Sequence, residues 1–166
     1  MSWLVVPPTV TNYLLPTTVL DSTESFLAER GALGVEGTAL WLGSMQSATD
    51  ALITSLHVPE QLAYRTPAGL AVEVTPAGMH ALIVGMDLKT FALVRVHTHG
   101  EAAYHSPTDD QNLILSHHGA ISIVVPNLGR DGIDLLRCSV NELRHGSGWH
   151  QLTAADAHRR IRVIDA

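Results

Sequence analysis

The stretch that decides the fold runs from residue 91 to residue 119 and reads FALVRVHTHGEAAYHSPTDDQNLILSHHG. Its first part, Phe91 to His99, is an apolar run that ends in two histidines, and it predicts a buried β-strand. Its second part opens with Ser106-Pro-Thr-Asp109. There a serine cap, a proline in the first turn and an acid three residues after the cap predict a helix that stops at Gly119.

These two predicted elements carry residues that could ligate a metal. Side chains at i and i+2 of a strand emerge on the same face, so His97 and His99 present two nitrogen ligands to one ion. Asp109 adds a carboxylate in the first turn of the helix that Ser106 caps. Two histidines and one aspartate make a three-ligand zinc site with a fourth position for water, which is the catalytic arrangement. Either pattern alone is more often structural, and their succession directly after a buried strand indicates a site.

A zinc-activated water also needs a group that accepts its proton and returns it to the leaving amine, and a carboxylate near the metal can do this. Glu36 stands just before the apolar run that starts at Thr38. It is either that general acid/base or an ordinary solvated acid between a helix and a strand. Spacing alone leaves both interpretations open.

Glu36 before Gly-Thr-Ala-Leu-Trp-Leu-Gly, His97-Thr-His99 and Ser106-x-x-Asp109 together resemble the JAMM motif of the MPN (JAB-domain) zinc metalloproteases. The resemblance covers nearly the whole chain in the order of its elements. It implies that His97, His99 and Asp109 ligate zinc, that Glu36 is the general acid/base and that Ser106 stabilises the oxyanion. It also implies an α/β (α+β) fold, the MPN-like and cytidine-deaminase-like three-layer arrangement with a mixed central sheet flanked by helices, formed by residues 1–166 as one domain.

The sequence departs from the family pattern in two places. Gly100 follows the second histidine where the family usually has proline, and the interval from His99 to Ser106 is one residue shorter than the commonest form. Counting the common interval from His99 would select Asp110 as the ligand. We prefer Asp109, because it keeps the Ser-x-x-Asp spacing, whereas Asp110 would be turned by about 100° around the helix.

Strands and helices are expected to alternate along the rest of the chain. Further strands are predicted at residues 38–43, 50–58, 120–126, 132–140 and 160–164, and further helices at 21–31, 75–86 and 153–159. The strands at 120–126 and 132–140 read as an antiparallel hairpin, which predicts a mixed sheet rather than a purely parallel one.

Composition excludes several classes of protein. Of 166 residues, 46% are hydrophobic and 16% are charged, which is typical of a folded domain with a real core. Ten Lys+Arg against 16 Asp+Glu give a formal charge of -6, and the cations are dispersed, so neither nucleic acid nor an anionic membrane surface is an expected partner. The start lacks a cationic leader and no apolar run is long enough to span a bilayer, so a cytoplasmic protein is expected.

The other histidines and the single cysteine have simpler interpretations. Cys138 cannot form an internal disulfide, and it is expected to be a small buried hydrophobe in a strand. His105 lies close enough to the motif to contact substrate or a metal ligand, but a solvated loop residue is the favoured interpretation. His117 and His118 are read as structural residues at the C-terminus of the helix capped by Ser106, where positive charge is favourable. Five more histidines lack metal-ligand spacing: His57, His80, His145, His150 and His158.

The leading functional prediction is a zinc-dependent isopeptidase or peptidase that cleaves after the C-terminal tail of a ubiquitin-like protein. The resemblance implies a compact bacterial form, whose relatives often accompany activating and conjugating enzymes for a ubiquitin-like modifier, some in anti-phage systems. Two alternatives remain open: a JAMM-like hydrolase of a sulfur-carrier tail or a small-molecule amide, and a metal-free MPN scaffold that only binds partners.

Overall fold

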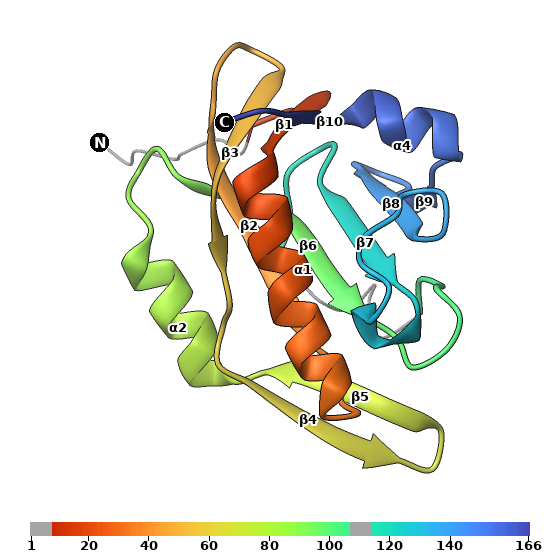
Figure 1. Cartoon of the computed structure of the whole chain (residues 1–166). Coiled ribbons are helices and arrows are strands. Elements are labelled where there is room, and N and C mark those ends of the chain that lie inside the picture. Colours follow the sequence, from red (N-terminus) through yellow and green to blue (C-terminus); the bar gives the residue numbers. More distant parts are fainter. Residues whose placement is uncertain (1–7, 107–113) are drawn as a thin grey trace.

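The computed structural model describes residues 8–106 and 114–166. Within these ranges eight strands form one sheet in the order β10-β1-β3-β2-β6-β7-β8-β9, and two more form the separate hairpin β4–β5 (Figure 1). The elements are β1 (Asn12–Pro16), α1 (Thr17–Ala32), β2 (Thr38–Met45), β3 (Asp50–His57), β4 (Gln61–Thr66), β5 (Gly69–Val74), α2 (Pro76–Gly85), β6 (Phe91–Thr98), β7 (Ile121–Val125), the 3-10 turn η1 (Asn127–Gly129), β8 (Ser139–Arg144), β9 (Gly148–Gln151), α4 (Ala154–Arg160) and β10 (Ile161–Ile164).

The sheet is mixed, as the sequence predicts. β6 pairs with β7 in parallel and with β2 antiparallel, so the histidine-bearing strand lies in the middle of the sheet. Helices flank the sheet, with α1 crossing one face (Figure 1). The expected α/β class with a mixed central sheet flanked by helices is therefore confirmed. Among the described residues, no helix is long and apolar enough to cross a membrane.

Helix α1 packs on the sheet through a stripe of buried residues. Val19 and Leu27 belong to the same core cluster as Trp41 of β2. The indole Nε1 of Trp41 donates to the hydroxyl of Thr23 at 2.9 Å, while that hydroxyl donates to the Val19 carbonyl at 2.7 Å. These bonds satisfy the polar atoms of two side chains that have no exposed surface.

The first two helices differ in how their N-termini are capped. The prediction that a polar residue near Asp21 starts the first helix is wrong, because α1 begins one turn earlier, after Pro16, without a side-chain cap. The second helix is confirmed: the hydroxyl of Thr75 accepts a hydrogen bond from the Gly78 amide, and Pro76 takes the first helical position.

Other predictions need correction. Residues 132–138 form turns and coil instead of a strand, and the partner of β7 is β8, which begins only at Ser139. The described end of the predicted 106–119 helix, residues 114–119, is turn and coil, and residues 107–113 lie outside the described part. Four strands were not predicted at all: β1, β4, β5 and β9.

The β4–β5 hairpin extends away from the main sheet (Figure 1), and the side chain of Gln61 at its base bonds to β2. The Gln61 carboxamide accepts a hydrogen bond from the Thr38 amide and donates to the Thr38 carbonyl, both at 2.9 Å. It also donates to the Pro59 carbonyl at 2.9 Å. The Gln61 carboxamide thus bonds the backbone of Thr38 as a neighbouring strand would. It fixes the base of the hairpin beside the residues that precede β2.

Candidate active site

The end of β6 is bonded to the turn that precedes β2. The Thr98 amide donates to the Gly37 carbonyl at 3.0 Å, and the Gly37 amide donates to the Thr98 hydroxyl oxygen at 3.0 Å. Thr98 has no exposed surface, and Gly37 is buried. This reciprocal pair holds Glu36 next to the segment that carries His97 and His99, although 61 residues separate Gly37 from Thr98.

A second contact fixes the backbone of Glu36. The guanidinium of Arg30 on α1 donates to the Glu36 carbonyl from Nε at 3.3 Å and from Nη2 at 3.1 Å. Glu36 itself is only 7% exposed, so it is not the solvated acid that its position before a strand also allowed. Its carboxyl group is therefore shielded from most of the bulk water.

The two histidines of the motif lie close together. Their ring centroids are 5.3 Å apart, with the ring planes inclined by 66°. His97 is 5% exposed within β6, and His99 follows the end of that strand and is half-buried. Tyr104 packs its ring edge against His99, with a centroid distance of 4.6 Å, and leaves 59% of its own surface exposed.

The loop after His99 is anchored by η1. The Leu128 amide donates to the His99 carbonyl at 2.9 Å, and the Asn127 amide donates to the Glu101 carbonyl at 3.0 Å. Asn127 and Leu128 hold positive φ angles of 51° and 55°, a region that non-glycine residues rarely adopt. This strained turn aims two backbone amides at the loop and fixes its path.

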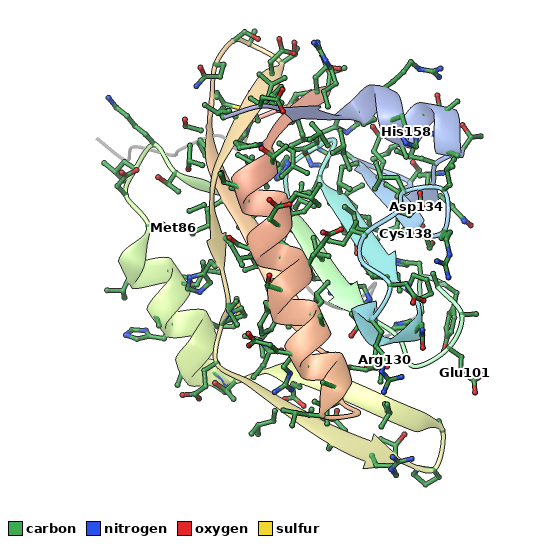
Figure 2. All side chains as sticks on the ribbon, in the orientation of Figure 1. Met86, Glu101, Arg130, Asp134, Cys138 and His158 are labelled. Carbon is green, nitrogen blue, oxygen red and sulfur yellow. The ribbon has the colours of Figure 1, made fainter. Side chains whose placement is uncertain are left out.

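Four residues of the predicted motif line one cavity of about 760 Å³. They are Glu36, His97, His99 and Ser106, and the opposite wall is built by the β4–β5 hairpin. The loop from Gly100 to Tyr104 contributes the remaining side (Figure 2 labels Glu101 at its outer edge). The structure therefore brings an acid, two imidazoles and a hydroxyl to a single cavity, from two segments distant in sequence.

The third predicted ligand lies outside the described residues. Asp109 and its alternative Asp110 lie in residues 107–113, outside the described part. Within the described residues, no group of three His, Cys, Asp or Glu side chains is arranged to hold a metal ion. The donors that are present still fit zinc, because two imidazoles and a nearby carboxylate at a cavity wall are the ligand types and setting of a catalytic site.

Two other histidines, His105 and His117, differ from what their sequence positions predict. His105 is half-buried and packs against Trp149 of β9, with ring centroids 5.4 Å apart, instead of lying in solvent. His117 is structural, but positive charge is not the reason. Its Nε2 lies 2.9 Å from the Tyr13 hydroxyl, and burial followed by the charges of His145 and His118 lowers its pKa to about 4.

Cys138 is not placed in a strand, since β8 begins at the next residue. It is partly buried and packs against the hydrophobic core, near Asp134 in Figure 2. Burial first, then the charge of Asp134, raises the pKa of its thiol to about 12. A thiol that stays protonated at neutral pH is a poor nucleophile, so the expectation of an unreactive side chain agrees with the structure.

Sequence reasoning missed the residues that hold the site together. Thr98 had a weak signal, because it separates the two histidines at a strand end. Gln61 and Arg30 had none, because their roles depend on backbone groups that only the folded chain brings within reach. Tyr104 and the hairpin residue Arg65, both of which line the cavity, were also not predicted.

The fold and the site define an α/β protein with a candidate metal-dependent hydrolytic centre. The chain is 31% identical over 150 residues to the "Probable metalloprotease y4jG" of Sinorhizobium fredii, an alignment that covers 90% of this chain and 92% of that one. The chain therefore belongs to the family of this probable metalloprotease, which implies a metal ion. No family model matches the sequence.

Two solved structures support the fold alone. A protein of Desulfitobacterium hafniense, determined in solution, aligns with a TM-score of 0.58 at 11% identity and covers 93% of this chain and 94% of its own. A protein from Salinibacter ruber aligns with a TM-score of 0.53 at 15% identity, covering 84% and 88%.

Proposed function

We propose that the protein is a JAMM-type zinc peptidase or isopeptidase that cleaves after the extended C-terminal tail of a ubiquitin-like protein. The observation that carries this proposal is the convergence of Glu36, His97, His99 and Ser106 on one cavity. The family membership supports a metalloprotease, and the spacing of these residues supports the JAMM type.

Each residue of the motif has a distinct role in this proposal. His97 and His99, with Asp109, would hold the zinc ion, whose chemistry when bound is to polarise a carbonyl and to lower the pKa of water towards about 7. Glu36 takes a proton from the attacking water and returns it to the leaving amine. The Ser106 hydroxyl donates a hydrogen bond to the oxygen that gains negative charge in the tetrahedral state.

The hairpin supplies a place for an extended substrate. Within the described residues, β5 is paired on one side only, with β4, and Leu70, Ala71 and Val72 of β5 line the cavity. A peptide in extended conformation can add to such an edge through main-chain hydrogen bonds. This mode suits a flexible tail, which reaches the cavity without requiring a complementary globular surface at the cleavage site.

The test combines metal content with cleavage. Purified protein is expected to hold close to one zinc per chain by elemental analysis. It is also expected to cleave a linear fusion in which a ubiquitin-like protein precedes a second protein. The ubiquitin-like protein is taken from a bacterium that encodes this chain. Glu36→Gln should lower kcat by at least about 100-fold while zinc content is unchanged, because only the proton carrier is lost. Full activity in Glu36→Gln would refute the mechanism.

The same experiment separates the alternatives. Cleavage of a short amide with no cleavage of any fusion would favour the small-molecule hydrolase. Tight binding of a ubiquitin-like protein without zinc and without cleavage would favour a scaffold. Activating and conjugating enzymes of the same system are the further partners expected if the fusion is cleaved.

A further inference from the structure

Arg65 lines the cavity but has no part in the proposed catalytic mechanism. Three charged residues other than the histidines line the cavity within the described chain: the acids Glu36 and Glu101, and the cation Arg65. Glu101 is exposed at the outer edge of its loop, where it points away from the body of the protein (Figure 2). The positive charge on the hairpin wall is therefore available to a substrate.

The register of the hairpin fixes the direction of Arg65. Arg65 of β4 lies directly opposite Leu70 of β5, so the two side chains are on the same face. Leu70 Cδ1 lies 3.6 Å from the position that a Cβ on Gly100 would occupy. The face that carries Arg65 is thus turned towards the loop that follows His99.

The Arg65 side chain also makes no polar contact that would stabilise the described part of the fold. No hydrogen bond or ion pair joins its guanidinium to the described residues, in contrast to that of Arg160, which is 2.7 Å from the buried Glu142. Its side chain is exposed, so its charge is not required to compensate a buried acid. A guanidinium offers parallel N–H groups that match a carboxylate in geometry as well as charge.

We propose that Arg65 is a specificity residue that binds a carboxylate on the substrate segment lying along β5. The carboxylate can belong to an acidic side chain or to the end of a chain, and the chemistry of recognition is the same. This inference rests on the proposed function, because it assigns the substrate preference of that cavity. It predicts that acidic tails or free chain ends are preferred over neutral ones.

The test measures peptide binding, so it does not depend on cleavage. The full-length protein carrying Glu36→Gln, to prevent turnover, is titrated by NMR with acetyl-Gly-Gly-Glu-Gly-amide and with its Gln counterpart. A third peptide, the Gln sequence with a free C-terminal carboxylate, distinguishes the two sources. At least one carboxylate peptide is expected to bind about three- to tenfold more tightly than the neutral peptide, with shifts at Gly69 and Leu70.

Variants of Arg65 decide the outcome. Adding Arg65→Gln should abolish the preference, and Arg65→Glu should reverse it, while the amide spectrum confirms the fold. Arg162→Gln, which removes an exposed arginine from β10, is the matched control and should keep the preference. The proposal is overturned if the Arg65→Gln protein retains the preference, or if none of the peptides binds. Failure of the proposed function shows instead as missing zinc or missing fusion cleavage.

Discussion

Replacing Thr98 by valine tests whether the bonds between Gly37 and Thr98 align the site. Valine keeps the branched shape of threonine in a place with no exposed surface, so it creates almost no cavity. What is lost is the hydroxyl oxygen that accepts from the Gly37 amide at 3.0 Å. A buried amide left without an acceptor costs about 1–3 kcal/mol.

This loss of unfolding free energy lowers the Tm by a measurable amount. A chain of 166 residues changes its Tm by about 3 °C for each kcal/mol, so Thr98→Val should unfold about 3–9 °C lower and show a matching loss in urea unfolding. Glu36 is adjacent to the released amide, so its carboxylate should lose its alignment. A displacement of about 1 Å is worth on the order of 100-fold in rate, and kcat should fall at least tenfold.

Thr98→Ser is the matched control. It keeps the hydroxyl and loses the methyl that lies near Gly129, so it should lose about 1 kcal/mol of stability but keep its kcat. Hydrogen exchange at the Gly37 amide should be accelerated in Thr98→Val and not in Thr98→Ser. A valine variant with native stability, native exchange at Gly37 and native kcat would refute the idea that this bond aligns Glu36.

Two further predictions concern the supports of the site and of the sheet. Gln61→Ala removes the bonds that join the hairpin to β2, so KM should rise more than kcat falls, and amide exchange in β4 and β5 should accelerate. His117 is neutral in the folded protein because its pKa is lowered to about 4 from 6.5. Its contribution to stability is therefore fully present above pH 6.5 and is lost as the pH falls towards 4. The expected loss is about 3 kcal/mol in urea titrations across this range. In His117→Gln this part of the pH dependence should disappear, and an unchanged profile would contradict the assignment.

Patterns with a local physical cause were read correctly from the sequence. The helix that starts at Thr75-Pro76 is specified by its own cap and proline, and the strand that ends in His97 and Thr98 by a continuous apolar run. The strand expected at 132–140 failed for a different reason. Its leucines are typical of a buried strand. In the structure, however, Asp134 accepts hydrogen bonds from the backbone amides of the turn that follows it, and pairing with β7 begins only at Ser139.

The hairpin β4–β5 shows the limit of composition as a guide. Its strands carry mixed polar and apolar residues with no regular alternation, because the pair is only partly covered by the rest of the protein. Strand pairing there is stabilised by cross-strand contacts and by the anchor at Gln61, neither of which has a sequence pattern. The sequence therefore did not predict the hairpin that forms one wall of the candidate site.

The sequence by itself determined which residue types are available as metal donors, and it predicts the class of chemistry. A single cysteine excluded a thiolate cage, and the spacing of His97, His99, Ser106 and Asp109 predicts a hydrolytic zinc site, which stays a prediction. Only the tertiary structure decided that Glu36 is buried beside these histidines, and that a hairpin carrying Arg65 faces them across a cavity. The physical reason is that ligand spacing is a property of one strand, whereas the contacts of Glu36 and Arg65 depend on hydrogen bonds between segments far apart in the chain.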